Sequence, residues 1–302
     1  MPYAATILAD SIASGVRLVT MQVTYPRMIH SELMTHRVFS RNAASSRAIP
    51  IEKMIAGVVK DPVIPVWWGK NQKGMQAEEE LHGAAKEQAQ VLWLQARDAA
   101  VQSAQSMFAA GLHKQLVNRV IEPWMWITVI ITATEWDNFF ALRCNSKAQP
   151  EIRTIAEMMK AVMESSTPKP LKTGEWHLPY IDDEDREAFD DHDPAALPSS
   201  YLPRVSCARC ARVSYLTQDG KRDINADLDL HDRLIKPGHM SPFEHAAMVG
   251  NDQDVIEATD GLVAGDGDGC AGDPRQFIGN FRAPWIQYRK GLPNEAVFRA
   301  AE

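Results

Sequence analysis

The residues that could do chemistry are most concentrated between positions 36 and 47, in the run HRVFSRNAASSR. The run contains three arginines, three serines, one asparagine and one histidine, but no lysine and no acidic residue. A solvated charged face usually mixes both signs of charge, whereas guanidinium and hydroxyl groups together bind phosphate oxygens through charge-assisted hydrogen bonds. The composition of this run therefore predicts an anion-binding site.

A second polar cluster lies near the middle of the chain, where Arg119 precedes Pro123 and the run LRCNSKAQ spans 142–149. Arg143 and Lys147 are four residues apart, and like charges at that helical spacing repel each other slightly. The pair therefore favours a shared ligand that is anionic or carries a carbonyl group. A simple pair of surface cations is the alternative.

A third cluster, HMSPFEH at 239–245, places two histidines, a serine and a glutamate at a turn that contains a proline. These side chains could donate to and accept from a polar heterocycle or a phosphate. Metal binding is disfavoured because Glu244 adjoins His245, whereas helical ligand pairs are three or four residues apart. Structural capping of a helix is the alternative.

Two further motifs predict no chemistry. Cys207 and Cys210 have the spacing of a redox pair or half a zinc site, but no second pair exists, so ordinary buried thiols are expected. The Gly/Asp run GDGDGCAGD at 265–273 has no strand-to-helix context and no following lysine, so it predicts a surface loop. We expect no metal site.

Length and composition predict an ordinary globular protein of one large domain or two smaller ones. The chain has 302 residues, of which 45% are apolar and 24% charged, with a net charge of −7. This charge argues against binding polymeric nucleic acid, although a local basic pocket for one phosphate remains compatible with it. No apolar run approaches the ~18 residues of a membrane span, and no basic segment precedes the first apolar stretch, so a cytoplasmic protein is expected.

Hydrophobic patterning predicts the α/β framework that must position these clusters. A strand with one buried face is expected over 16–25, followed after Pro26 by a helix over 26–39. A buried strand is expected over 127–134, where seven of eight residues are β-branched. Further helices are expected over 77–110, 113–122, 150–164 and 227–235, and an ordered loop over 62–75.

The domain organisation predicted is a single catalytic unit over 1–302. Residues 165–205 form an acidic and proline-rich segment, with eight acidic residues between 182 and 193, and are expected to be a solvated linker. The C-terminal part, 206–302, carries the segments ARVSY and GHMSPFEH.

Taken together, three stretches resemble the flavin-dependent thymidylate synthases. TMQVTYPRMIHSELMTHRVFSRNAASSRAIP is similar to the family's signature region, and NRVIEPWMWITVIITATEWDNFFALRCNSKAQPEIRTIAEMM to its Arg-x-x-x-Pro segment and its Leu-Arg…Ala-Gln-x-Glu-Ile-Arg helix. ARVSY with GHMSPFEHA is similar to the segment that opens the family's catalytic domain. That segment comes last here, so the chain resembles a circularly permuted or rearranged member. The implied fold is α+β, with an antiparallel or mixed sheet and long helices.

The resemblance implies roles for individual residues. Arg143 would polarise the pyrimidine ring as the catalytic residue. Flavin would be contacted by His36, Arg37, Asn138, His239, Ser241 and Glu244. The nucleotide would be bound by Glu32, Ser45, Ser46, Arg47, Arg119 and Arg143.

Several residues depart from the family's pattern at positions expected to recognise the pyrimidine base and the flavin. Thr35 replaces an arginine and Glu32 a glutamine, Ala43 replaces a glutamate and Lys147 a histidine, and an Asn-x-Arg turn has become Thr-Glu-Trp at 134–136.

The implied activity is one-carbon transfer from methylenetetrahydrofolate to C5 of a pyrimidine deoxynucleoside monophosphate, first of all dUMP to dTMP. FAD would relay the carbon and supply the hydride, with NADPH reducing it, and the enzyme would be a homotetramer with sites between subunits. Hydroxymethylation or methylation of dUMP or dCMP is the alternative, because the carboxylate of Glu32 can accept from a cytosine amino group. A non-catalytic flavin- or nucleotide-binding module is a further alternative.

Overall fold

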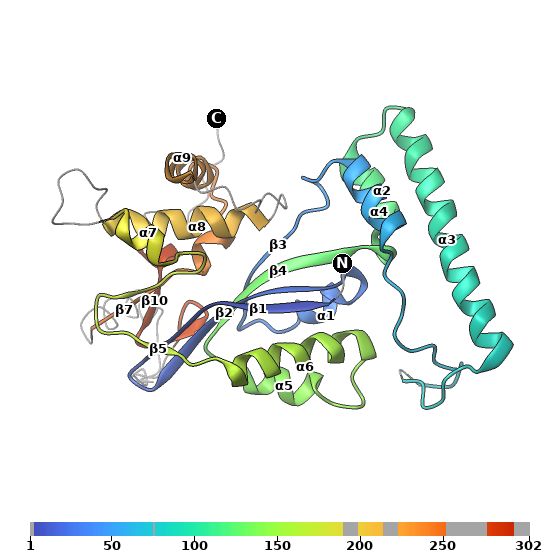
Figure 1. Ribbon diagram of the computed structural model, residues 1–302, viewed down its shortest axis with the longest axis horizontal. Helices are drawn as coiled ribbons and strands as arrows, with labels where there is room; N and C mark the ends of the chain where they lie inside the picture. The colour runs from blue at the N-terminus through green and yellow to red at the C-terminus, as the bar shows by residue number, and fades with distance from the viewer. Residues whose placement is uncertain (1–2, 75, 190–198, 214–222, 252–276, 293–302) are drawn as a thin grey trace, which may run out of the picture.

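A five-stranded mixed sheet forms the centre of the protein (Figure 1). In this computed structural model, residues 3–74, 76–189, 199–213, 223–251 and 277–292 are described. The strand order is β3-β4-β2-β1-β5, and only the β1–β5 pair is parallel. The strands are β1 (Ala4–Ala13), β2 (Val16–Pro26), β3 (Ser40–Ala43), β4 (Trp126–Ala133) and β5 (Lys169–Pro170). The predicted α/β class is confirmed.

The two faces of this sheet differ in chemistry, because successive side chains on a strand point to opposite sides. On one face, Met21 and Val23 of β2 lie beside Val129 and Ile131 of β4, and all four are fully buried. On the other face, Thr20 and Thr24 of β2 pair with Thr132 and Thr128 of β4. The sheet therefore has an apolar face and a polar one, and both are buried.

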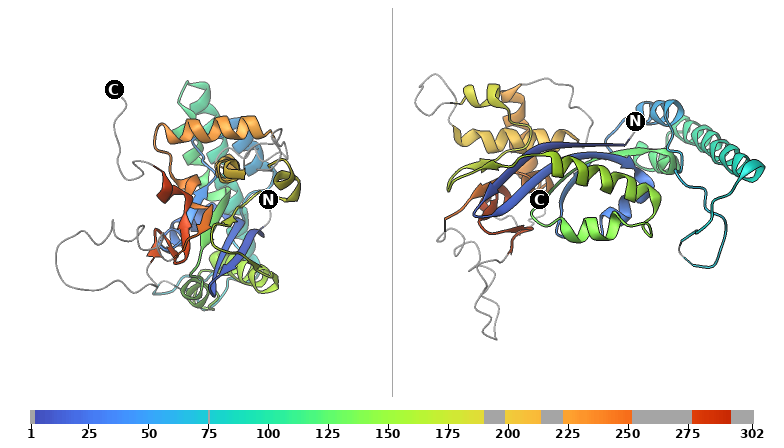
Figure 2. Two further views of the ribbon diagram at one scale, coloured as in Figure 1. Left: turned by 90° about the vertical axis from the view of Figure 1, so that its left-hand side faces the viewer. Right: turned by 60° about the horizontal axis from the view of Figure 1, so that its bottom comes forward.

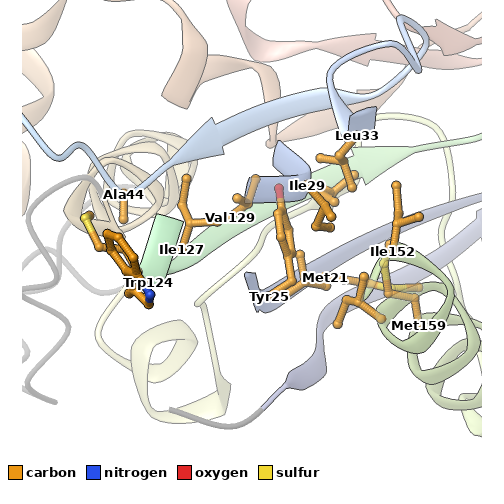
Figure 3. Packing of buried hydrophobic residues seen from close by; sticks show 14 of the residues in the cluster. Met21, Tyr25, Ile29, Leu33, Ala44, Trp124, Ile127, Val129, Ile152 and Met159 are labelled. Atoms are coloured by element: carbon orange, nitrogen blue, oxygen red, sulfur yellow. The ribbon is translucent and has the colours of Figure 1, made fainter. Parts of the chain in front are cut away.

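The apolar face packs against helix α6 (Pro150–Ser165) and, beside it, α5 (Asp137–Arg143), as Figure 3 shows for the labelled side chains. Ile152, Ile155 and Met159 of α6 are all 0% exposed. They occur at helical spacing, so one stripe of α6 covers the sheet. Burial of such a side chain stabilises the fold by about 1.5–3 kcal/mol.

A helical arm extends from the far end of the sheet (Figure 1). It contains α2 (Ile51–Lys60), the long α3 (Gly83–Ala109) and α4 (Lys114–Val120). Helix α3 ends before Gly111, whose φ of 89° is readily adopted only by glycine. Only Val101 and Ala104 of α3 are buried, so most of this helix faces solvent.

The C-terminal part of the structure, taken from Trp176 onward, covers the polar face of the sheet on the side opposite α5 and α6 (Figures 1 and 2). It contains helices α7 (Asp183–Glu187), α8 (Leu202–Arg212) and α9 (Ile224–Ile235), and 3₁₀ turns η5 (Ser241–Glu244) and η6 (Tyr288–Gly291). A second sheet has the order β10-β7-β6, formed by Trp285–Gln287, Ala247–Val249 and Trp176–His177. A separate two-stranded hairpin is formed by β8 (Phe277–Ile278) and β9 (Phe281–Arg282).

A buried chain of hydroxyl and imidazole groups joins this part to the polar face. His177 contacts Ser11 and Thr20 through its two ring nitrogens at 2.9 and 2.8 Å, and Thr20 contacts Thr132 at 2.7 Å. Thr132 in turn contacts Nδ1 of His245 at 2.8 Å. Burial lowers the pKa of both histidines to about 3, so both are neutral at physiological pH.

Most predicted elements are present, with different ends. The strands expected over 16–25 and 127–134 are β2 and β4, and the helices expected over 113–122, 150–164 and 227–235 are α4, α6 and α9. The helix expected from residue 77 begins at Gly83, because residues 76–81 pair back onto the preceding loop, where Leu81 N–H donates to the Trp68 carbonyl at 2.8 Å.

Two expectations differ more strongly from the structure. The helix expected over 26–39 is wrong beyond Leu33: only the turn η1 (Arg27–Ile29) and the one-turn α1 (His30–Leu33) form. The chain then turns so that Phe39 packs on Trp136 and Phe139. Within 165–205, expected to be a solvated linker, the structure contains β5, β6, α7 and the start of α8. Asp185 of α7 is buried by its ion pair with Arg209, whose Nη1 lies 2.6 Å from Oδ2.

Candidate active site

Arg143, at the C-terminal end of α5, is the centre of the candidate site. Its Nε donates to Nε2 of His36 at 3.0 Å, and its Nη1 donates to Oε2 of Glu32 at 3.1 Å. Its Nη2 lies 3.4 Å from both the Glu32 carbonyl and Oγ1 of Thr35. Three residues with separately predicted roles, Arg143, His36 and Glu32, are therefore in direct contact.

Aromatic packing holds His36 in this position. The His36 ring packs edge-on against Phe139 of α5, with ring centroids 4.9 Å apart, and stacks on Phe39 at 5.8 Å. Trp136, at the start of α5, donates from its ring nitrogen to the Ala133 carbonyl at 3.0 Å and so ties the helix to the end of β4. Residues from the loop before β3 and from α5 are thus locked together.

The contact with Arg143 fixes the protonation of His36. A guanidinium N–H can only donate, so Nε2 of His36 is the acceptor and the ring proton is on Nδ1. Burial lowers the pKa of His36, and the neighbouring Arg143 and Arg41 lower it further. His36 is therefore a neutral imidazole that can donate from Nδ1.

A surface pocket of about 410 Å³ opens beside this cluster. Its walls include His36, Arg37, Asn138 and Arg143, together with Glu135. Three of the residues expected to contact flavin therefore line one pocket with the residue expected to polarise the pyrimidine. The side chains of Arg37 and Asn138 are exposed at its rim.

The 239–244 segment lies next to β3, which follows His36 and Arg37 in the chain. Ser241 Oγ donates to Oδ1 of Asn42 at 3.3 Å, and Glu244 forms an ion pair with Arg289. His239 is exposed, and none of the described contacts joins it to Ser241 or Glu244. The structure thus brings Ser241 and Glu244 to the strand beside the pocket but leaves His239 at the surface.

The residues expected to bind phosphate lie at the other end of β3. The Oε1 of Glu122 accepts from Ser46 Oγ at 3.1 Å and from Arg119 Nη1 at 2.9 Å, and it lies 2.9 Å from Nη2 of Arg27. The carboxylate of Glu122 therefore accepts hydrogen bonds from the hydroxyl of Ser46 and the guanidinium of Arg119, which were expected to bind a phosphate. Ser45 and Arg47 flank Ser46, and the side chain of Arg47 is exposed.

The predicted nucleotide-binding residues consequently form two groups within one chain. Glu32 and Arg143 adjoin the pocket, whereas Ser45, Ser46, Arg47 and Arg119 lie past the opposite end of β3. Each group contains donors for a nucleotide, but they are not brought together.

Sequence reasoning missed three partners at this site. Glu122 holds the Ser46–Arg119 group, Arg289 pairs with Glu244, and Arg282 of β9 contacts Glu135 at the pocket with its Nη2 3.0 Å from Oε2. The acidic residue in the run RVIEP was the available signal for Glu122, because a carboxylate near several arginines usually pairs with one. The other two contacts join segments about 45 and 147 residues apart, for which the sequence carries no local signal.

Other features bear on chemistries that were considered. Cys207 and Cys210 on α8 are fully buried free thiols, and burial raises the pKa of both, as expected for structural cysteines. Among the residues described, no group of three or more His, Cys, Asp or Glu side chains could hold a metal ion. No helix in the described ranges is long and apolar enough to cross a membrane. Cys270 and the 265–273 run lie outside the described residues.

Comparison with known proteins identifies the family. Two crystal structures of the UMP/dUMP methylase PolB from Streptomyces cacaoi are similar to the chain, one bound with 5-Br UMP and one with 5-Br dUMP. The first has a TM-score of 0.44 at 16% identity over 54% of this chain and 89% of that one, and the second 0.42 at 13% over 54% and 90%. No curated protein matches the sequence. The profile of the thymidylate synthase complementing proteins matches residues 17–169, slightly more than half of the chain, and the protein therefore belongs to that family, Thy1.

Proposed function

We propose that this thymidylate synthase-like methyltransferase transfers a one-carbon unit to C5 of a pyrimidine nucleoside monophosphate, with dUMP as the first-choice substrate and dTMP as the product. The observation that carries the proposal is the contact of Arg143 with both His36 and Glu32 beside a 410 Å³ pocket. Through this contact Arg143, expected to polarise the pyrimidine ring, touches His36, expected to bind flavin, and Glu32, expected to bind the nucleotide.

The chemistry of Arg143 suits a pyrimidine whose C5 must act as a nucleophile. As C5 attacks an electrophilic carbon, charge develops along the N3/carbonyl edge of the ring, and a preorganised cation there stabilises the transition state. The planar guanidinium can present parallel donors to adjacent ring atoms. Contacts to His36 and Glu32 hold it in place before substrate binds, so little reorganisation is needed at the moment of reaction.

The pocket also offers a donor set that fits a flavin. Neutral His36 can donate from Nδ1, and Arg37 and Asn138 place a cation and an amide at the rim, where ring carbonyls and an anionic tail need partners. We infer that FAD is held here, with Ser241 and Glu244 near its edge. When bound, it would supply the hydride and carry the one-carbon unit donated by methylenetetrahydrofolate, with NADPH as the reductant.

The nucleotide phosphate is assigned to the Ser45–Arg47 group with Arg119. Because this group lies at the opposite end of β3 from Arg143, we infer that a complete site uses the phosphate-binding group of a second subunit. A homotetramer with sites between subunits satisfies this requirement. Glu122 would have to release the donors of Ser46 and Arg119, or share them with the phosphate.

The second candidate is C5 methylation or hydroxymethylation of dCMP. Glu32 favours it, since a carboxylate beside the ring edge can accept from the exocyclic amino group of cytosine. A non-catalytic binding module is less well supported, because Arg143 would then have no reason to be preorganised.

The test is release of tritium from C5-tritiated dUMP and dCMP, incubated with FAD, NADPH and methylenetetrahydrofolate. The proposal predicts release from dUMP. Release from dCMP alone would show that the substrate is dCMP instead of dUMP. Release from neither nucleotide would contradict catalysis and favour a non-catalytic binding module.

A further inference from the structure

We propose that a pocket between helix α2 and the N-terminal end of strand β4 is a second ligand site, which binds an amphipathic anion, a molecule with an apolar body and one acidic head group. The pocket has a volume of about 360 Å³. It is separate from the pocket beside Arg143, because the two pockets share no lining residue among those described. The inference goes beyond the proposed function and does not depend on it.

The walls of this pocket are apolar. Ala44, Trp124 and Ile127, which lie together in Figure 3, form one part of the wall. Met54 and Val58 of α2 form another part, and none of these five residues is more than 9% exposed. Transfer of apolar surface from water into such surroundings is favourable. The part of the ligand that enters the pocket is therefore apolar.

Polar groups in the wall are already bound to partners within the chain. Ser46 Oγ donates to Oε1 of Glu122 at 3.1 Å, and the hydroxyl of Thr128 lies 3.0 Å from that of a threonine on β2. The indole nitrogen of Trp126 donates to the Asp61 carbonyl at 3.0 Å. A polar ligand body would lose its hydrogen bonds to water here and find few replacements.

Positive charge lies on the α2 side of the pocket. The lining includes three cations, Arg27, Lys53 and Lys60, and one acid, Asp61, among the described residues. Lys53 and Lys60 are exposed, and neither ammonium group has an ion pair or hydrogen bond with any residue that the structure describes. The two lysines are seven residues apart, about two helical turns or 10.5 Å along the axis, so they lie on one side of α2. An anionic head group fits between them.

Gly57 keeps the space between the two lysines open. It lines the pocket on the same side of α2, four residues after Lys53 and three before Lys60. A Cβ at Gly57 would have no heavy atom within 4 Å. Glycine destabilises a helix interior relative to alanine, and here the missing side chain leaves an entrance for the ligand.

The pocket differs from the group of residues proposed to hold the nucleotide phosphate. Ala44 and Ser46 line it, whereas Ser45 and Arg47 are not among its described lining residues. Ala44 and Ser46 are buried and Arg47 is exposed, as expected where alternate residues point to opposite sides. A nucleotide would also place its polar base or ribose against apolar walls, so it is disfavoured as the ligand.

The experiment uses 8-anilinonaphthalene-1-sulfonate, whose fluorescence rises in apolar surroundings and which carries one sulfonate. Its dissociation constant is measured with the full chain as wild type, Gly57→Leu and Lys53→Gln/Lys60→Gln. We expect Gly57→Leu to bind the probe at least ~10-fold more weakly, because leucine fills the entrance, and it should fold, since the space is open and leucine favours helices. The double lysine variant should also lose at least ~10-fold, because both charge-assisted contacts to the sulfonate are removed.

Matched controls separate these losses from general effects of the substitutions. Ala56→Leu adds the same side chain at the neighbouring exposed position of α2, which is not among the described lining residues of this pocket. Lys73→Gln/Lys172→Gln removes two exposed lysines that lie elsewhere. Both controls should bind the probe as the wild type does.

Competition identifies the class of ligand. Octanoate should displace the probe from the wild type at a lower concentration than 1-octanol, its neutral counterpart, and should lose this advantage in the double lysine variant. Inorganic phosphate and dUMP should not displace it. Displacement by dUMP would assign the pocket to the nucleotide, and equal displacement by octanoate and octanol would remove the anion requirement, so either result overturns the proposal.

Wild-type affinity for the probe in Gly57→Leu and in the double lysine variant would also overturn it. A further contrary outcome is that Gly57→Leu changes the oligomeric state, measured by sedimentation velocity, and leaves probe affinity unchanged. A second copy of the chain would then fill the pocket. None of these results bears on C5 transfer, which the tritium assay tests separately.

Discussion

Nε of Arg143 donates to Nε2 of His36 at 3.0 Å, across 107 residues of sequence, and this contact fixes the tautomer of the histidine. The proton of the neutral ring is on Nδ1, and burial together with the charges of Arg143 and Arg41 keeps the pKa of His36 low. Two residues that sequence reasoning gave to different ligands thus act on each other directly.

The first prediction concerns this tautomer. Nitrogen-15 NMR of the wild type should show His36 protonated at Nδ1 at neutral pH and still neutral below the usual histidine pKa of 6.5. In Arg143→Ala the donor to Nε2 is lost, so the Nε2–H form should become populated. An Nε2–H signal for His36 in the wild type would contradict the contact.

The second prediction concerns turnover. Arg143→Ala should lower C5 tritium release by roughly 10²–10³-fold, because one preorganised donor to a developing charge is lost. Ground-state nucleotide affinity should change far less. Lysine should rescue poorly, since an ammonium group lacks the planar fork that spans His36 and Glu32. Arg153→Ala, which removes a partly exposed guanidinium from α6, is the matched control and should retain wild-type turnover.

The third prediction separates nucleotide binding from flavin binding. Ser45→Ala and Arg47→Ala should weaken dUMP binding, since charge-assisted hydrogen bonds to phosphate are worth about 1.5–3 kcal/mol each. Bound flavin, measured by its absorbance, should be unaffected. If both variants bind dUMP as the wild type does, the 45–47 group has no part in phosphate recognition.

The fourth prediction concerns stability and pH. The pKa values of His177 and His245 are lowered by burial from 6.5 to about 3, so the unfolded chain binds more protons than the folded one between these limits. The stability that depends on these neutral histidines should therefore be complete above pH 6.5. Below that pH the free energy of unfolding should fall by about 1.4 kcal/mol per pH unit for each histidine.

Urea denaturation at a series of pH values measures this slope. His177→Gln should flatten it, whereas His82→Gln, at an exposed histidine before α3, should leave it unchanged. Equal slopes in the wild type and His177→Gln would show that His177 binds its proton equally well in the folded and unfolded states, which contradicts its lowered pKa.

The fifth prediction tests which face of the sheet forms the apolar core. Ile155→Ala should reduce the free energy of unfolding by about 2–5 kcal/mol, since Ile155 is fully buried between α6 and the sheet. Val91→Ala, on the solvent face of α3 where Val91 is 48% exposed, should cost less than about 0.5 kcal/mol. Thermal or urea unfolding measures the free energy of unfolding of both variants. Similar losses of this free energy would contradict the assignment of Ile155 to the core.

Local patterns in the sequence predicted those strands and helices in which hydrophobic spacing and residue propensity favour the same secondary structure. The alternation of Met21, Val23 and Tyr25 predicted β2, and the β-branched run before Thr134 predicted β4. Strand β1 was missed because its segment AATILADSIA is alanine-rich and half-exposed, so its pairing with β2 rather than its composition makes it a strand. The helix expected through Phe39 ends early for the converse reason, since tertiary packing of Phe39 on α5 overrides local propensity.

The resemblance to the family implied roles for single residues but not how those residues are arranged. His36, Arg37, Asn138 and Arg143 line one pocket, and the ligands assigned to them stay predictions. The pairing of Arg119 with Glu122 is local, three residues apart, whereas the pairing of Ser46 with Glu122 joins segments 76 residues apart, which no local pattern encodes. The threonines on one face of β2 and β4 can be recognised in the sequence. That they bind the C-terminal part follows only from their contacts with His177 and His245.

The most direct test of the account is mass spectrometry of the nucleotide formed from dUMP, with dCMP in parallel, when the protein is supplied with FAD, NADPH and methylenetetrahydrofolate labelled with carbon-13 at the transferred carbon. We expect dTMP that carries the label in a methyl group at C5, and no labelled product from Arg143→Ala on the same timescale. Recovery of unlabelled, unchanged nucleotide from a protein that binds both flavin and dUMP would contradict it.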